Sequence, residues 1–205
     1  MNPYLSETEY AVQNLLLLVN KEEALLAEKL FALTSTEAKL RVHQWDFESS
    51  DLNDDFSEAY VMAAFGRMAN AAKETESLRR EASELQALVG IRQAAIQAIC
   101  GAILQIAKQG ISVVHGGLSD APTGRMIGSA GVRDIIWQGR NQSLHYEEGK
   151  PKKGVLDLFA TLEKEQGPQF SLTHHASQNR AAQVVQLLGW TTYAAYLSDM
   201  SMVLP

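Results

Sequence analysis

The sequence predicts an all-α protein, built as an antiparallel up-and-down helical bundle with additional helices. Apolar residues recur at three- and four-residue spacing over most of the 205 residues, and the chain has only five prolines. No segment shows the alternation of polar and apolar residues that is typical of a half-buried strand. A hydrophobic fraction of 46% and a charged fraction of 20% are those of a folded protein, so we expect a single domain over residues 1–205.

Residues 1–50 are expected to form an acidic N-terminal helical part. Ser6 and Glu9 have the spacing of a capping box, so a helix should begin there and continue through Leu33. A second helical piece is expected from about Thr36 to Trp45. The following stretch, DFESSDLNDDF, is rich in acidic and turn-forming residues, which predicts a loop or linker.

The main bundle is expected over residues 54–200. A helix should run from about Asp55 to Leu88, and its charged part, KETESLRREASELQ, predicts a single narrow buried stripe. Gly90 is expected to interrupt the helical pattern. The segment Ile91–Val114 is the most apolar, so we place it at the centre of the core, with Cys100 as a buried thiol.

The C-terminal half predicts further helices separated by loops. Residues 116–129 hold Gly, Pro and Ser and predict a loop, and a helix should follow over residues 130–146. Shorter helical patterns cover residues 155–165 and 177–197.

Several functional classes are disfavoured by composition. The uninterrupted apolar runs are short and the N-terminus has no basic segment, so we expect neither a membrane partner nor a secretory signal. A single cysteine excludes an internal disulfide framework, and we expect a cytoplasmic protein.

The charge is unevenly distributed along the chain. The net charge of -6 argues against binding bulk nucleic acid through a wide basic face. Residues 1–60 hold four Lys or Arg against 12 Asp or Glu, whereas residues 122–153 hold six against three. The second segment is therefore the locally basic part of an acidic protein, and it is either a solvated surface or a binding surface.

Other chemical motifs are weak. The stretch GRMIGS at residues 124–129 lacks the lysine and spacing of a phosphate-binding loop, so a flexible loop is the better interpretation. His174 and His175 are adjacent and would point about 100° apart on a helix, which does not suit joint metal binding. There is no GxSxG nucleophile motif and no Glu-x-x-His. We expect no metal and no cofactor.

The stretch GRNQSLHY, residues 139–146, combines side chains that suit RNA cleavage. On a helix, Asn141 and His145 share a face with Gln138, and the long side chain of Arg140 can reach towards them. An arginine can hold a phosphate through two hydrogen bonds, and a histidine can transfer a proton at neutral pH. One histidine supplies one acid or base, and a twofold dimer with this helix at its interface would supply two.

The segment Arg140-Asn141-Gln142-Ser143-Leu144-His145 resembles the R-x4-6-H signature of the HEPN family, in which a polar residue often follows the arginine. The resemblance covers this motif and the helical architecture. It implies a metal-independent endoribonuclease that works as a homodimer with a composite site, in toxin–antitoxin, phage-defence or other RNA-targeting systems. Arg140 would then stabilise the scissile phosphate, His145 would be the general acid or base, and Asn141 would orient the histidine or contact RNA.

Around these three residues, the candidates for binding the RNA substrate are Arg133, Gln138, Tyr146 and Lys150. The function expected is RNA cleavage by a toxin or antiviral defence effector, with an antitoxin or defence-complex subunit as a further partner. The alternative is a catalytically silent helical module that binds a protein partner or a nucleotide, since some members of the family are inactive.

Overall fold

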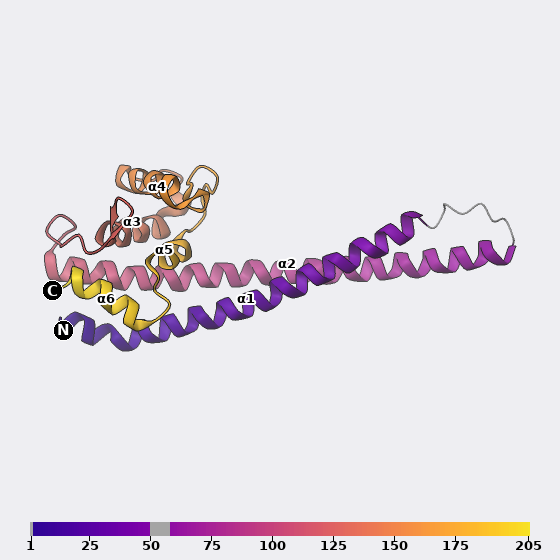
Figure 1. Cartoon of the computed structure of the whole chain (residues 1–205), viewed down its shortest axis with the longest axis horizontal. Helices are drawn as coiled ribbons and strands as arrows, with labels where there is room; N and C mark the ends of the chain where they lie inside the picture. Colours follow the sequence, from indigo (N-terminus) through magenta and orange to yellow (C-terminus); the bar gives the residue numbers. More distant parts are fainter. Residues whose placement is uncertain (1, 50–57) are drawn as a thin grey trace. The chain divides into compact units, whose positions relative to one another are not determined.

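The computed structural model confirms the all-α class, with 79% of residues in helices (Figure 1). It describes residues 2–49 and 58–205, and within them the side chains outside residues 43–49, 58–61, 63–65, 67 and 68. The helices of this described part are α1 (Pro3–Ser49), α2 (Glu58–His115), α3 (Val132–His145), α4 (Lys153–Gln166), α5 (Ala181–Leu188) and α6 (Tyr193–Val203). Two 3-10 turns, η1 (Tyr146–Glu148) and η2 (Pro168–Phe170), and a small antiparallel hairpin of β1 (Met126–Ile127) and β2 (Ala130–Gly131) complete it.

The first helix begins earlier and runs further than the sequence predicted. Asn2 caps it, because its side-chain Oδ1 accepts a hydrogen bond of 3.1 Å from the Tyr4 backbone N–H. Ser6 is therefore inside the first turns, and the predicted capping box is wrong. The predicted break before Thr36 is also wrong, since no proline or glycine interrupts α1. Of the predicted loop at residues 46–56, the first four residues are helical and the rest lie outside the described residues.

Gly90 does not interrupt the second helix. The helix α2 continues through it to His115, and Gly90 is exposed with nothing within 4 Å of the position of a Cβ atom. One glycine costs a helix only about 1 kcal/mol, which the apolar contacts on either side outweigh. Gly116, with a φ of 76°, ends the helix as predicted.

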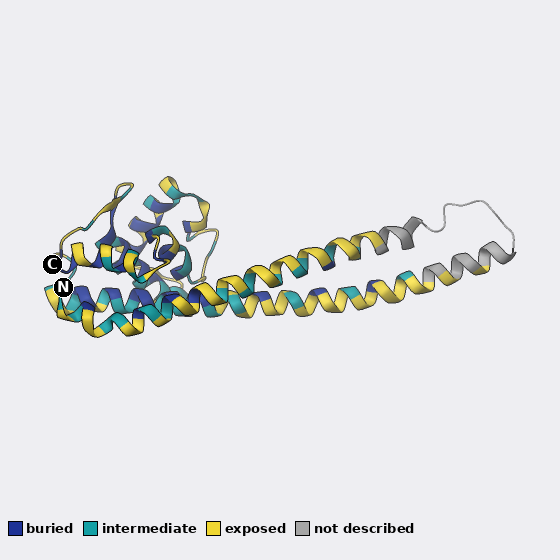
Figure 2. Cartoon of the chain, turned by 60° about the horizontal axis from the view of Figure 1, so that its bottom comes forward, coloured by how far each residue is buried: buried dark blue, intermediate teal, exposed yellow. Residues whose placement is uncertain are grey.

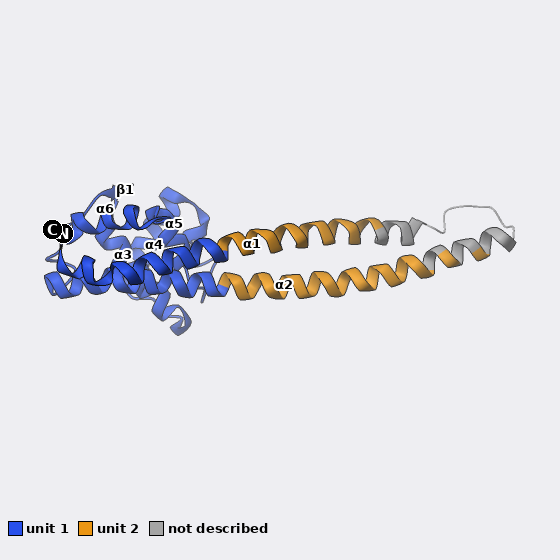
Figure 3. Cartoon of the chain, turned by 90° about the horizontal axis from the view of Figure 1, so that it is seen from below, with its two compact units in different colours: residues 1–22, 94–205 blue, residues 23–93 orange. Residues whose placement is uncertain are grey.

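The chain separates into two compact units, shown in Figure 3. Unit 2 is residues 23–93, and its described residues belong to α1 and α2. Its α2 segment buries one residue in every seven, at Thr75, Ala82 and Val89, and leaves the intervening charged residues exposed (Figure 2). This is the narrow buried stripe that the sequence predicted, with the seven-residue spacing of a coiled coil. A 3.2 Å hydrogen bond from Thr36 to Glu81 joins its two helices.

Unit 1 is residues 1–22 and 94–205, and it holds the main core. As predicted, the last part of α2 lies at its centre: the buried positions recur every three or four residues and are Ile96, Cys100, Ile103, Leu104, Ala107 and Ile111. The start of α1 packs against α2, where the Tyr4 hydroxyl donates a 2.7 Å hydrogen bond to the carbonyl of Ile106. A Cβ on Gly110 would lie 2.7 Å from the Tyr4 ring, so this close approach requires glycine.

The last predicted helix, residues 177–197, is two helices instead. Gly189 adopts a left-handed conformation with a φ of 70°, and its N–H bonds to Gln186 O, which ends α5. Thr192 then begins α6 by accepting a hydrogen bond from the Ala195 N–H. The apolar periodicity is continuous across the break, so periodicity alone could not locate it.

A buried carboxylate on α6 holds the loop that precedes α3 in place. Asp199 on α6 is 2% exposed and accepts two hydrogen bonds from Arg125, at 2.5 and 3.0 Å, and one of 2.9 Å from the Trp190 indole. Arg125 also donates to the carbonyl of Leu188. The carboxylate is thus paired with a cation and saturated with donors, which offsets the cost of burying it.

Within the described residues, one helix, Ala69–His115, is long and apolar enough to cross a membrane by length and composition. A core helix passes the same test, and part of this helix forms the centre of unit 1. The absence of a membrane partner therefore stays a prediction.

Replacing Asp199 by Ala should destabilise unit 1 by about 3 kcal/mol, because the Trp190 N–H and the Arg125 guanidinium both lose their acceptor. Urea denaturation followed by circular dichroism measures this change. Asp157, which forms a surface ion pair with Lys153, provides a control: Asp157→Ala should move the midpoint little. Equal effects of the two substitutions would contradict the structural role of Asp199.

Candidate functional site

Helix α3 carries the GRNQSLHY stretch and lies against α4, α5 and α6. Its buried residues are Val132, Ile135, Ile136, Gly139 and Gln142, which recur at helical spacing and define the inward face. Gly139 allows the closest approach, since a Cβ there would lie 2.8 Å from Val184 Cγ1 on α5. The other residues of the stretch consequently flank this face.

Gln142 fixes the end of α3 to the chain that leads into α5. Its side chain is 6% exposed, donates to the carbonyl of Gln178 at 2.8 Å and accepts from the Arg180 N–H at 2.9 Å. Asn179 adds a 3.4 Å hydrogen bond to the carbonyl of Ser143. The Arg180 guanidinium is also buried, with a hydrogen bond to Gln178 Oε1, and burial lowers the pKa of that guanidinium.

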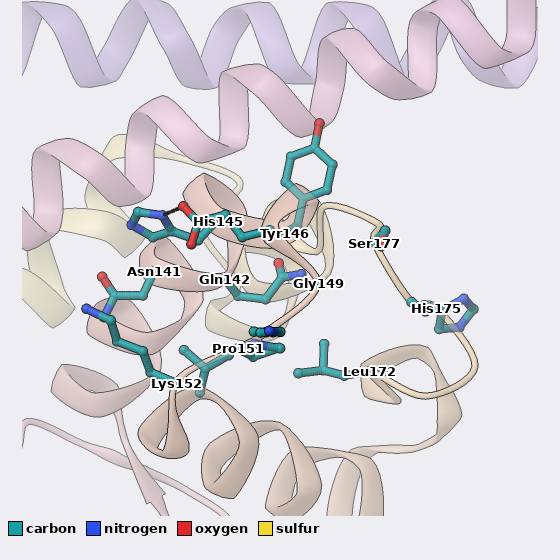
Figure 4. Close-up of a pocket in the computed structure, with 14 residues that line it drawn as sticks. Asn141, Gln142, His145, Tyr146, Gly149, Pro151, Lys152, Leu172, His175 and Ser177 are labelled. Carbon is teal, nitrogen blue, oxygen red and sulfur yellow. Dashed lines mark hydrogen bonds and ion pairs between the residues drawn. The ribbon is translucent and has the colours of Figure 1, made fainter.

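His145 is the last residue of α3 and lines a pocket of about 170 Å³, shown in Figure 4 and named here the His145 pocket. Its walls come from the end of α3, from residues 146–152, from Val155 on α4 and from residues 172–177. Asn141 lines the same pocket, which agrees with the prediction that it shares a face with His145. The pocket belongs entirely to unit 1.

Glu148 holds the His145 ring. The Nδ1 atom of His145 lies 2.5 Å from Glu148 Oε1, and the side chains are 43% and 64% exposed. A carboxylate accepts only, so in the neutral ring this contact places the proton on Nδ1 and leaves Nε2 as the acceptor. The sequence interpretation missed Glu148. Its signal was the spacing of three residues from His145, which is that of neighbouring side chains on a helix.

Arg140 lies on the other flank of α3. Its Nε donates to Gln105 Oε1 on α2 at 2.5 Å, and its Nη1 donates to Asn141 Oδ1 at 3.3 Å. It lines a shallow groove with small residues of α2 and with the exposed Leu144, and this groove does not include His145. No ion pair joins Arg140 to any acidic residue of the described chain. Its guanidinium is thus held by neutral amide groups.

Asn141 lines the His145 pocket and is hydrogen bonded to Arg140. It accepts from Arg140, and its Nδ2 donates to Gln138 Oε1 at 3.3 Å, as the predicted polar stripe requires. Its side chain makes no hydrogen bond to His145 among the described residues. Glu148, and not Asn141, is therefore the residue that orients the histidine in the structure.

The other substrate-binding candidates separate into two groups. Tyr146 and Lys150 line the His145 pocket, and Gln138 adjoins it through Asn141. Arg133 lies in the first turn of α3, where its Nη1 donates a 2.5 Å hydrogen bond to the carbonyl of Ala121. The structure therefore does not bring Arg133 together with the pocket.

The basic segment is dispersed in three dimensions. Arg125 is paired with Asp199, Arg133 with Asp134 and Lys153 with Asp157. Lys150 and Lys152, in contrast, line the His145 pocket and are exposed, and neither forms an ion pair with a described residue. Of the cations in this segment that form no ion pair with a described residue, Lys150 and Lys152 thus line the His145 pocket, which Glu148 also lines, and Arg140 lines the groove on α2.

Two other sequence features are the GRMIGS stretch and the adjacent histidines. The GRMIGS stretch forms β1 and the turn after it. In this turn the hydroxyl and the N–H of Ser129 donate hydrogen bonds to the Glu165 carboxylate, and they hold the pKa of that carboxyl below its usual value. His175 lines the His145 pocket, but Figure 4 shows its ring turned away from the other labelled side chains. Among the described residues, no group of three His, Cys, Asp or Glu side chains is placed to hold a metal ion.

Comparison of the chain with protein families, with curated proteins and with solved structures finds no match. The resemblance to the HEPN signature therefore rests on residues 140–145 and on the helical architecture.

The contact with Glu148 predicts a tautomer. In its neutral form the His145 ring should carry its proton on Nδ1, and Glu148→Ala should shift the population towards Nε2–H because the acceptor is lost. Nitrogen-15 NMR of the imidazole distinguishes the two forms. Glu147→Ala, which removes a neighbouring carboxylate that bonds Tyr146 instead, should leave the tautomer unchanged. A wild-type ring with its proton on Nε2 would contradict this contact.

Proposed function

We propose that this protein is a metal-independent endoribonuclease that resembles the HEPN family, with His145 as general acid or base and Arg140 as the phosphate-binding residue. The observation that carries the proposal is the His145 pocket itself. It combines an imidazole oriented by a carboxylate with two lysines that form no ion pair with a described residue. The same helix also presents an arginine held by neutral groups.

The proposed reaction uses the neighbouring 2′-hydroxyl as nucleophile. Its oxygen attacks phosphorus, so that the O2′–P bond forms while the P–O5′ bond breaks, giving a 2′,3′-cyclic phosphate and a 5′-hydroxyl. A base removes the 2′ proton, and an acid supplies a proton to O5′. With Nδ1 held by Glu148, His145 Nε2 is the atom placed for one of these transfers.

The second transfer and the phosphate contact are proposed to come from a second copy of the chain. Within one chain, His145 lines the His145 pocket, whereas Arg140 lines the groove on the other flank of α3. A twofold dimer with α3 at its interface would set the arginine of one copy near the histidine of the other. The groove beside Arg140 is lined by Ala98, Gly101 and Ala102, which allow another surface to come close.

The same separation of Arg140 and His145 supports a second candidate, a catalytically silent module that binds a protein partner or a nucleotide. In that case the pocket would bind its ligand without cleavage. A role as toxin or antiviral effector, with an antitoxin or defence-complex partner and a cytoplasmic location, belongs to the first proposal and rests on the family resemblance alone.

The proposal is tested by incubating the purified protein with RNA in EDTA. The wild type should cleave, and His145→Ala should lower the rate about 10²-fold or more, the usual contribution of a positioned acid or base. His174→Ala is the matched control, because His174 is exposed and does not line the pocket. Equal cleavage by His145→Ala and the wild type would reject the role of the histidine, and a wild type that cleaves no RNA would favour the silent module.

A further inference from the structure

The His145 pocket has an apolar interior that proton transfer at a phosphate does not require. Pro151, Val155, Leu172 and Ala176 all line it, while His145 and the two lysines line it from α3 and from the segment that follows. Figure 4 shows Leu172 and Pro151 on the inner walls, with His145 at one end. A concave, mostly apolar site with a few polar groups is the general form of a small-ligand site.

The backbone around the pocket supports a built site. Ser177 is the residue other than glycine that has a positive φ, 55°, within the described chain, and it lines this pocket. Strain of this kind costs about 1 kcal/mol or more and tends to concentrate at functional positions. Gly149, which also lines the pocket, has a φ of 65°.

The chemistry of a ligand for the pocket can be inferred from its basic side chains and its apolar walls. Lys150 and Lys152 suit an anion, and Figure 4 shows Lys152 extended towards Asn141, beside His145. The apolar walls suit a flat group with apolar faces, and a nucleobase attached to a phosphate through ribose has both properties. A base in a duplex is stacked and paired, whereas a base in a single strand can leave the stack and enter a pocket.

We infer that the His145 pocket binds one unpaired nucleobase of the substrate, next to the phosphate that faces His145, and so selects single-stranded RNA. This inference rests on the proposed function for its substrate, and it assigns Leu172 and Pro151 to base binding and Lys150 and Lys152 to the phosphate. Specificity thus comes from the pocket walls, which agrees with the net charge of -6.

Binding is tested without cleavage, by titrating the full chain with adenosine or uridine 5′-monophosphate and with ribose 5-phosphate. The two nucleotides should bind about fivefold or more tightly than ribose 5-phosphate, because the base buries apolar surface against Leu172 and Pro151. Leu172→Asn should remove this difference in affinity. It should leave the affinity for ribose 5-phosphate unchanged, since the substitution adds no charge near the phosphate. Leu156→Asn is the matched control: Leu156 is exposed on α4 and does not line the pocket.

Equal affinities of the wild type for ribose 5-phosphate and for both nucleotides would overturn the inference, and this comparison holds whether or not Leu172→Asn folds. Retention of the difference in folded Leu172→Asn would also overturn it. Cleavage separates this inference from the nuclease proposal. If the protein binds nucleotides through the base but cleaves no RNA, the base pocket is supported and the nuclease proposal is rejected. If the protein cleaves single strands and duplexes equally and binds ribose 5-phosphate as tightly as nucleotides, the nuclease proposal is supported and the base pocket is rejected.

Discussion

The hydrogen bonds of the Gln142 side chain are the constraint on which the rest of the site depends. This buried amide joins the last turn of α3 to Gln178 and Arg180, and so it fixes the position of the loop that forms one wall of the His145 pocket. An amide uses both its donor and its acceptor here, which a charged or apolar side chain of similar size could not do. Gly139, one turn earlier, sets how closely α3 approaches α5. The two residues together place His145 at the border of a pocket.

The helical class, the central position of residues 96–111 and the narrow stripe of unit 2 could be predicted, because each depends on apolar spacing within one segment. The breaks between helices were predicted less well. Gly90 lies within a helix and Gly189 ends one, although both are single glycines in a continuous apolar pattern. The difference is a backbone conformation, which depends on the packing of the residues that follow and which no local pattern specifies.

The candidate site shows the same limit at the level of side chains. Spacing on a helix correctly placed Asn141 on the same side as His145 and in contact with Gln138. It could not show that Arg140 bonds to α2 or that the segment 172–177 closes the pocket, since these contacts join parts of the chain far apart in sequence. Glu148 was within reach of a local argument, because it lies three residues after His145, although it is in η1, beyond the end of α3.

The central claim is that His145 supports cleavage of RNA by the neighbouring 2′-hydroxyl. The most direct measurement is the chemical identity of the product ends, determined by mass spectrometry after digestion of a defined single-stranded RNA in EDTA. The account predicts 2′,3′-cyclic phosphates and 5′-hydroxyls, and no cleavage at a linkage whose 2′-hydroxyl is replaced by hydrogen. Products with 5′-phosphates, or cleavage at the 2′-deoxy linkage, would contradict it, because water and not the 2′-hydroxyl would then be the nucleophile.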